Sequence, residues 1–281
     1  MKKVRGIKPV KRKSSHVDFK GDINKYKRNY KDEIDEEKAK LQLEGRNSVL
    51  EALNSGKTID KIIVKQGEIE GTLKVIVAKA HEKGIVVSKV DKAKMDEISV
   101  TGNNQGVIAF CPAHEYSSVE EILQKAYDKN EDPFIIVLDE ITDPHNLGAI
   151  IRTADACGAH GVIIPKRRSV SLTAVVAKAS AGAIEYVSVA RVTNIANTID
   201  MLKKSGVWTA AADMDGEEYF DAPLKGAIAV VIGNEGKGVS RLVKEKCDFS
   251  LSIPMLGKIS SLNASVAAGL IMYEIVRQRK V

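Results

Sequence analysis

The sequence predicts an α/β fold in which a large C-terminal domain follows a smaller one. Short apolar runs with strand character alternate with runs of helical spacing, an order typical of parallel or mixed sheets covered by helices. A length of 281 residues with 44% hydrophobic residues is sufficient for two cores. We therefore divide the chain into an N-terminal segment at 1–40, a small domain at 41–115, a linker at 116–132 and a large domain at 133–281.

The N-terminal segment is strongly basic. Residues 1–31 contain twelve Lys and Arg and two acidic residues, whereas the net charge of the whole chain is only +6. Cations interleaved with aromatic residues suit RNA phosphates and bases, although an extension that only increases solubility would have the same composition. We expect residues 1–40 to be disordered and favour RNA binding by this segment, with Lys11, Arg12 and Lys13 among the contacts.

The small domain should contain three strands and three helices. Its strands are predicted at 62–64, 85–90 and 106–111, and its helices from Asn47, Leu73 and Lys92. The run at 55–58 resembles the end of a phosphate-binding loop. Glu51 stands where such a loop requires its first glycine, and this excludes an NTPase site.

The large domain should repeat a strand, a loop and a helix. Strands are predicted at 134–138, 162–164, 186–189, 207–211, 227–232 and 249–253. Helices are predicted at 146–157, 172–181, 195–204, 241–246 and 263–279, with a short helix at 119–127 in the linker.

Three loops of the large domain follow strands at the positions where α/β proteins bind small ligands. The first, at 143–148, opens a helix with an apolar stripe. Asn146 is the expected N-cap of that helix, and Arg152 should lie opposite the stripe. Taken alone, an arginine at such a position is more commonly a solvated helix residue.

The second loop, at 233–238, places Glu235 among glycines, which permit close approach of backbone to ligand. Glu235 fits a turn or a ligand contact equally well. The third loop, at 256–263, offers Ser260, Ser261 and Asn263 either to a ligand or to the cap of the last helix. That helix is apolar on nearly all sides, which favours burial inside the fold or at a subunit interface.

Several classes of protein are excluded by missing patterns. The glycines at 233–238 read G-x-x-G-x-G, which differs from the dinucleotide fingerprint, and the acid expected about 20 residues later is missing. No metal-ligand spacing occurs, so we expect no metal site. Three cysteines without paired spacing indicate a reducing compartment, which we take to be the cytoplasm. No apolar run is long enough for a membrane span, and no secretory signal is recognised.

The three loops, in this order, resemble the three motifs of the SpoU (TrmH-like) branch of the SPOUT RNA methyltransferases. The matching segments are 143–154, 231–240 and 253–267. Residues 45–114 also look like the small L30e-like domain that binds RNA substrate in the 23S rRNA guanosine 2′-O-methyltransferases. The resemblance therefore assigns Arg46 and Asn47 to RNA binding.

This resemblance implies transfer of a methyl group from S-adenosylmethionine to a ribose 2′-OH, most specifically of a guanosine in 23S rRNA. It also implies a C-terminal trefoil knot, a homodimer formed through the knot domain and the last helix, and backbone contacts to the cofactor at Gly233, Ile253 and Leu262. The implied catalytic residues are Asn146, Arg152, Glu235, Ser261 and Asn263.

Arg152 is assigned in some family schemes as the base that deprotonates the 2′-OH. A guanidinium stays protonated near neutral pH, so we prefer Arg152 as a clamp on the target phosphate and a stabiliser of the developing alkoxide. Asn146 and Glu235 would orient Arg152 and the ribose, while Ser261 and Asn263 would hold the cofactor or cap the last helix.

Three other readings stay open. A tRNA 2′-O-methyltransferase shares the same motifs, and a non-catalytic RNA-binding factor could retain the fold. The third, a dinucleotide enzyme, is disfavoured by the glycine order and the missing acid, and NAD binding without S-adenosylmethionine binding would revive it. The sequence fixes neither the target nucleotide nor the role of the basic segment.

Overall fold

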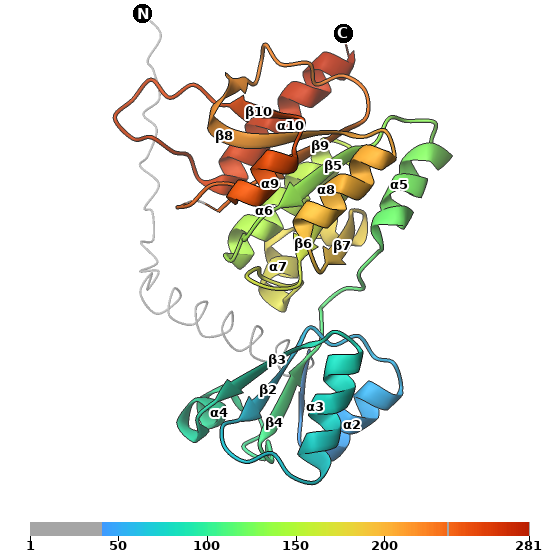
Figure 1. The fold of residues 1–281 in the computed structure, drawn as a ribbon, viewed down its shortest axis with the longest axis vertical. Coiled ribbons are helices and arrows are strands. Elements are labelled where there is room, and N and C mark those ends of the chain that lie inside the picture. Colours follow the sequence, from blue (N-terminus) through green and yellow to red (C-terminus); the bar gives the residue numbers. More distant parts are fainter. Residues whose placement is uncertain (1–40, 235, 281) are drawn as a thin grey trace, which may run out of the picture. The chain divides into compact units, whose positions relative to one another are not determined.

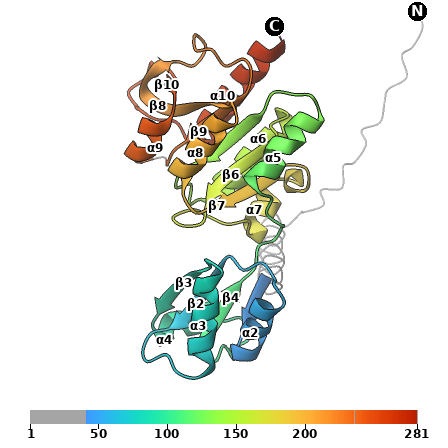
Figure 2. The same cartoon turned by 45° about the vertical axis from the view of Figure 1, so that its right-hand side comes forward.

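The computed structural model describes residues 41–234 and 236–280, which form two β-sheets with their covering helices (Figure 1 and Figure 2). The predictions for residues 1–40, including disorder and RNA contacts at Lys11, Arg12 and Lys13, lie outside the described residues, as does Glu235. The α/β class predicted from the sequence is confirmed.

The four-stranded sheet has the order β1-β4-β2-β3 and is mixed. β2 and β3 are parallel, whereas β4 runs antiparallel to both β1 and β2. Helices α2 and α3 pack on one face, and Met95 of α4 packs on the other. The elements are β1 (Gln42–Glu44), α2 (Arg46–Asn54), β2 (Lys61–Lys65), α3 (Thr72–Glu82), β3 (Val86–Val90), α4 (Lys92–Ile98) and β4 (Val107–Phe110).

The six-stranded sheet has the order β10-β8-β9-β5-β6-β7, and all its neighbouring strands are parallel. The carboxyl ends of its strands therefore share one edge. Its strands are β5 (Phe134–Leu138), β6 (Gly161–Pro165), β7 (Ser188–Val192), β8 (Trp208–Glu218), β9 (Ile228–Ile232) and β10 (Phe249–Ser252). Its helices are α5 (Val119–Asp128), α6 (Pro144–Ala156), α7 (Ala174–Ala179), α8 (Ile195–Lys204), α9 (Arg241–Lys246) and α10 (Ala264–Lys280), with a 3-10 turn at Ala183–Glu185.

Helices cover both faces of this sheet (Figure 1). α6, α7 and α10 pack with alternate strand residues on one face, while α5, α8 and α9 pack on the other. All five residues of both β5 and β9 are buried, as expected for central parallel strands that are covered on both sides. α5 lies within the segment predicted as a linker and begins with a capping box between Ser118 and Glu121.

β8 departs most from the prediction, because it continues to Glu218 rather than ending at 211. Its pairing with β10 shifts register between Ser250 and Leu251, whose partners in β8 are Ala211 and Glu217. The intervening residues of β8 are therefore extra with respect to β10 and bulge away from the ladder. A Cβ on Gly216 would lie 2.5 Å from the Leu251 backbone nitrogen, so this crossing requires glycine.

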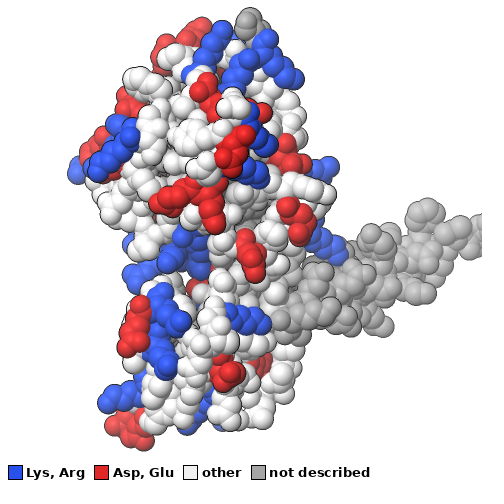
Figure 3. Space-filling model, turned by 90° about the vertical axis from the view of Figure 1, so that its right-hand side faces the viewer, with Lys and Arg blue, Asp and Glu red and all other residues white. Residues whose placement is uncertain are grey.

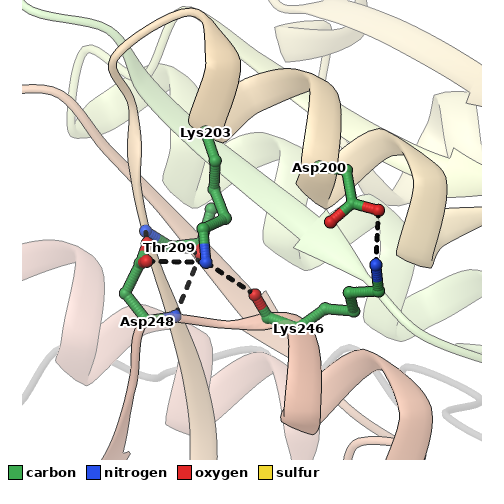
Figure 4. A network of polar contacts seen from close by, with 5 residues as sticks. All are labelled: Asp200, Lys203, Thr209, Lys246 and Asp248. Carbon is green, nitrogen blue, oxygen red and sulfur yellow. Dashed lines mark hydrogen bonds and ion pairs between the residues drawn. The ribbon is translucent and has the colours of Figure 1, made fainter.

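A polar network at the start of β10 joins α8, β8 and the end of α9 (Figure 4). Asp248 accepts hydrogen bonds from the backbone N–H and hydroxyl of Thr209 at 2.9 and 2.8 Å and pairs with Lys203 at 2.7 Å. Burial alone would raise the pKa of Asp248, but the bonds from Lys203 and Thr209 outweigh burial and hold this pKa below its ordinary value.

We expect Asp248→Asn to lower the free energy of unfolding by about 2 kcal/mol near neutral pH, because charge-assisted hydrogen bonds are lost. A carboxyl whose pKa is lowered by folding stabilises the protein above its unfolded pKa and ceases to do so as the pH falls through its folded pKa. The unfolding curves of wild type and variant in urea should therefore converge in strongly acidic solution.

Asp200→Asn is the matched control, since it removes a carboxylate from the same network. Asp200 pairs with Lys246 at 2.6 Å, but both side chains are about 40% exposed, and surface pairs contribute about 0–1 kcal/mol. Equal destabilisation by the two substitutions would contradict the role assigned to Asp248.

Candidate functional site

The main candidate site is a cavity of about 300 Å³ at the carboxyl ends of β9 and β10, beside the bulged middle of β8. It lies at the shared edge where a parallel sheet binds ligands. Its lining includes backbone from glycine-rich loops and several apolar side chains. The lining residues are Ala212, Asp213, Met214, Ile232, Gly233, Asn234, Gly236, Lys237, Gly238, Leu251, Ile253, Met255, Ser260, Ser261, Leu262, Ala264 and Ala267.

The floor of the cavity is the loop that follows β9. Asn234 and Gly238 exchange backbone hydrogen bonds of 3.1 and 2.8 Å, which close the loop on itself. A Cβ on Gly233 would lie 2.1 Å from the carbonyl carbon of Gly238, so the two backbone segments touch only because residue 233 is glycine. At Gly236 the nearest atom to such a Cβ is 3.6 Å away, and no similar constraint applies.

The loop after β5 is tied to this floor. The side-chain amide of Asn234 donates to the Glu140 carbonyl at 3.1 Å, and the Ser240 N–H donates to the Asp139 carboxylate at 2.8 Å. Glu140 adopts a positive φ of 61°, which is uncommon for a residue with a side chain. The sequence analysis did not identify Asp139 or Glu140, although two consecutive acids at the end of an apolar strand were the available signal.

The start of α6 corrects one prediction. Asp143, not Asn146, is the N-cap: its carboxylate accepts from the His145 N–H at 2.9 Å, and Pro144 occupies the first helical turn. Asn146 lies inside the helix and is 5% exposed. Its side chain therefore does not cap the helix, and this sequence prediction was wrong.

Asn146 instead contacts the start of α10. The Asn263 amide donates to the Asn146 side-chain oxygen at 2.9 Å. The Asn263 side-chain oxygen accepts from the backbone N–H groups of Ser265 and Val266 at 3.0 and 3.3 Å, which caps α10. One hydrogen bond thus joins the first and third predicted loops, 117 positions apart in the chain.

The other predicted site residues differ in whether they line the cavity. Gly233, Ile253, Ser261 and Leu262 all line the cavity. Arg152 lies on the exposed face of α6 and makes no hydrogen bond or ion pair with the described residues. Since Glu235 is not described, its position relative to Arg152 stays a prediction.

The predicted RNA contacts at Arg46 and Asn47 lie at the start of α2. The Arg46 backbone N–H donates to the Gln105 side chain at 3.1 Å, and its guanidinium Nε donates to the Gln105 carbonyl at 3.2 Å. Gln105 has a positive φ of 49°. The guanidinium is therefore held by the loop before β4, while Asn47 is exposed.

The cavity offers one carboxylate, Asp213, to a ligand with a positive centre; this carboxylate also pairs with Lys244, and Lys237 lies in the same lining. Asp213 is the only acidic residue among the described lining residues. Burial would raise its pKa, but hydrogen bonds from Lys244 at 2.8 Å and from the Asp215 N–H lower it, so the carboxylate stays charged. Sequence reasoning missed Asp213 and Met214; the polar interruption of an otherwise apolar strand was the signal.

The apolar lining fits the remainder of such a ligand. Leu251, Ile253, Met255 and Leu262 can contact a purine, and the loop backbone offers hydrogen-bonding groups to polar substituents. S-adenosylmethionine combines a purine, polar groups and a sulfonium, so the residues present fit this cofactor.

No three His, Cys, Asp or Glu side chains in 41–234 and 236–280 lie close enough together to hold a metal ion. Over the same ranges, no helix has both the length and the apolar character needed to cross a membrane.

Comparison with known proteins identifies the family. Residues 133–273 match the SpoU rRNA Methylase family, and residues 42–117 match a family described as RNA 2′-O ribose methyltransferase substrate binding. YacO of Bacillus subtilis, whose name assigns it to the TrmH family of tRNA/rRNA methyltransferases, is 49% identical over 240 residues. That match covers 84% of this chain and 94% of YacO. A Staphylococcus haemolyticus protein of the same family name is 50% identical over 236 residues, with the same coverage.

Solved structures agree with this result. An rRNA methyltransferase from Sinorhizobium meliloti with bound AdoMet is 26% identical, with a TM-score of 0.54 over 85% of this chain and 87% of that one. The SpoU methyltransferase AviRb from Streptomyces viridochromogenes, at 24% identity and a TM-score of 0.53 over 84% of this chain and 89% of that one, shares the fold. The chain therefore belongs to the SpoU rRNA methylase family of S-adenosylmethionine-dependent RNA methyltransferases.

Proposed function

We propose that this protein methylates a ribose 2′-OH of RNA, and that its target is a guanosine of 23S rRNA. The observation that carries the proposal is the Asn263–Asn146 hydrogen bond, which brings the start of α6 to the start of α10. The last helix follows directly on the cavity-lining segment that contains Ser261 and Leu262. The side chains suited to an RNA ribose and the pocket suited to the methyl donor therefore meet at one edge of the sheet.

Methyl transfer requires mainly that the methyl donor and the ribose oxygen are aligned. When bound, S-adenosylmethionine would supply a methyl group on a sulfonium; the ribose oxygen would take the methyl group in line, the thioether would leave, and the 2′-OH proton would pass to water. Asp213 would favour the positive charge of the ground state from the wall of the cavity. The closed loop at 233–238 would fix the floor, so that positioning supplies much of the rate.

Arg152 is exposed on α6, one helical turn or more beyond Asn146, and is accessible to a large polyanion. We assign it to a phosphate of the target nucleotide and to the charge that develops on the ribose oxygen. Asn146 and Glu235 would orient Arg152 and the ribose. Asn263 holds Asn146 and caps α10, while Ser261 would contact the cofactor or the ribose.

The domain division is part of the proposal. Residues 41–115 would bind RNA, with Arg46 and Asn47 in contact with it, and 133–281 would form the methyltransferase domain with a trefoil knot. The basic segment at 1–40 would add RNA affinity through Lys11, Arg12 and Lys13. The absence of paired cysteines favours the cytoplasm.

A homodimer through α10 is supported by the exposed side of that helix. Val266, Leu270 and Tyr273 are 50%, 40% and 54% exposed, whereas Ala268, Ile271 and Ile275 on the opposite side are fully buried. The sequence predicted that α10 is buried on nearly all sides, whereas within one chain only one side of this helix is fully buried. An apolar surface of this kind fits a second copy of the chain.

Mapping of ribose methylation tests the target. RNA from cells that lack this protein should lose one 2′-O-methyl in 23S rRNA and none in tRNA. Unchanged rRNA with one lost tRNA methyl would replace the rRNA target by the tRNA alternative, which the names of the relatives also allow. A non-catalytic RNA-binding role would be indicated if both RNAs were unchanged and S-adenosylmethionine failed to stabilise the protein.

We expect Gly233→Ala to abolish binding of S-adenosylmethionine. The added Cβ would overlap the backbone of Gly238 and Val239, so the floor of the cavity must move. At about 100 times Kd, a cofactor that binds only the folded protein adds about 2.7 kcal/mol of stability. Thermal unfolding with and without cofactor should show this gain for wild type and not for Gly233→Ala.

Gly236→Ala is the matched control, since its Cβ would meet only the Asn234 side chain at 3.6 Å. It should keep most of the cofactor-induced stabilisation. A normal thermal shift for Gly233→Ala would show that the loop at 233–238 is not the cofactor floor.

We expect Arg152→Ala to lower kcat for methyl transfer at least about 100-fold, because a charge that stabilises the developing alkoxide is removed. Since Arg152 does not line the cavity, the affinity for S-adenosylmethionine should stay unchanged. Arg241→Ala, at a side chain that is 90% exposed at the start of α9, is the control. Single-turnover methyl transfer to rRNA fragments measures both; full activity of Arg152→Ala with loss of activity in Glu235→Ala would reject the scheme centred on Arg152.

A further inference from the structure

A second cavity, distinct from the cofactor cavity, is lined by several cationic side chains. Its volume is about 320 Å³. Two of its walls are the loop before β2 and the turn after α3, and the third is formed by residues next to or within β6 and β7 of the six-stranded sheet. The lining residues are Gly56, Lys57, Thr58, Ile59, Asp60, Lys83, Gly84, Ile85, Val86, Tyr116, Lys166 and Arg191.

Among the described residues of this lining, Asp60 is the only acid, and it is already neutralised. Asp60 is 3% exposed, and its carboxylate pairs with Arg191 at 2.5 Å. The second guanidinium nitrogen of Arg191 donates to the Asp60 and Lys166 carbonyls, both at 3.2 Å. The Arg191 charge is thus matched by Asp60, and the charges of the three lysines are left over.

Within 41–234 and 236–280, no ion pair involves the ammonium group of Lys57, Lys83 or Lys166. Lys57 and Lys83 are exposed and Lys166 is half-buried, so their ammonium groups can turn toward a shared ligand. Three cations around one hollow repel each other unless an anion lies between them.

The Nε atom of Arg191 is buried and has no hydrogen-bond partner, while the side chain is 11% exposed. The guanidinium also lies over the ring of Tyr116 at 5.5 Å, which limits its movement. The ion-paired and stacked Arg191 therefore forms a fixed wall of the cavity.

We propose that this cavity binds a backbone phosphate of the RNA substrate through Lys57, Lys83 and Lys166. This inference rests on the proposed function and specifies how the RNA is held. Lysine ammonium groups attract phosphates as point charges and carry no base preference, so the cavity would position RNA without reading its sequence. In one view of the surface, Lys and Arg side chains gather near mid-height at the left-hand edge (Figure 3).

Lys166 also connects the cavity to the site of methyl transfer. It directly follows β6, whose carboxyl end lies at the same edge as the carboxyl end of β9. Only β5 separates these two strands, which places their ends about 10 Å apart. An RNA strand held at Lys166 would therefore continue toward the loop at 233–238.

The test is a triple variant, Lys57→Gln, Lys83→Gln and Lys166→Gln, in the full-length chain. We expect its affinity for the rRNA fragment that wild type methylates to fall about tenfold at moderate salt. The salt slope of log K should shrink by about 0.7 for each lost phosphate contact. KM for RNA should rise by a similar factor, while KM for S-adenosylmethionine and kcat at saturating RNA stay unchanged.

The matched control removes the same charge elsewhere, by Lys92→Gln, Lys204→Gln and Lys225→Gln, all at exposed positions. If this control weakens RNA binding as much as the test variant, or if the test variant binds like wild type, the phosphate cavity is rejected. Equal thermal unfolding of both variants and wild type excludes misfolding as the cause.

The two proposals fail in different ways. Wild-type protein that binds RNA without methylating it, and loses affinity in the test variant, would contradict the proposed function and support the cavity. Methylation of RNA by the wild type, with unchanged RNA affinity in the test variant, would support the proposed function and contradict the phosphate cavity.

Discussion

The backbone contact at Gly233 is the constraint on which the site depends. Residue 233 follows β9, one of the two central strands of the sheet. It lies against Gly238 so closely that no side chain fits between them. This contact closes the loop, and the closed loop then offers Asn234 to the Glu140 carbonyl and the Ser240 N–H to Asp139. Two loops from neighbouring strands are thereby fixed to each other. Because this loop is already ordered, binding of a ligand would lose less free energy in ordering the floor of the cavity.

Much of this arrangement could be predicted from the sequence, and the reasons differ by element. α8 and α9 begin and end where predicted, because apolar spacing and flanking polar residues agree. The extra length of β8 could not be predicted, since it depends on a register shift against β10, a strand about 40 positions away. The cap of α6 was predictable, since an aspartate before a proline is a strong N-cap signal, and choosing Asn146 overlooked it.

The candidate site shows the same division between local and distant information. The sequence placed Gly233, Ile253, Ser261 and Leu262 by motif, and the structure brings them to one cavity. It could not show that Asn146 and Asn263 share a hydrogen bond, because nothing local to either residue specifies its partner. Asp213 enters the cavity only because β8 bulges there, so its role follows from tertiary pairing rather than from a motif.

Opposite charges of cofactor and substrate explain why basic residues are distributed as they are. A sulfonium would be repelled by a cluster of lysines, and RNA would be repelled by a carboxylate. Among the described residues, the cofactor cavity contains one acid and one lysine, whereas the second cavity contains three lysines that lack ion pairs. In the arrangement that we propose, the attraction for RNA lies at the second cavity, away from the methyl donor. The segment from 249 to 273 contains no Asp or Glu, so Asp213 is the one carboxylate in the described lining of the cofactor cavity.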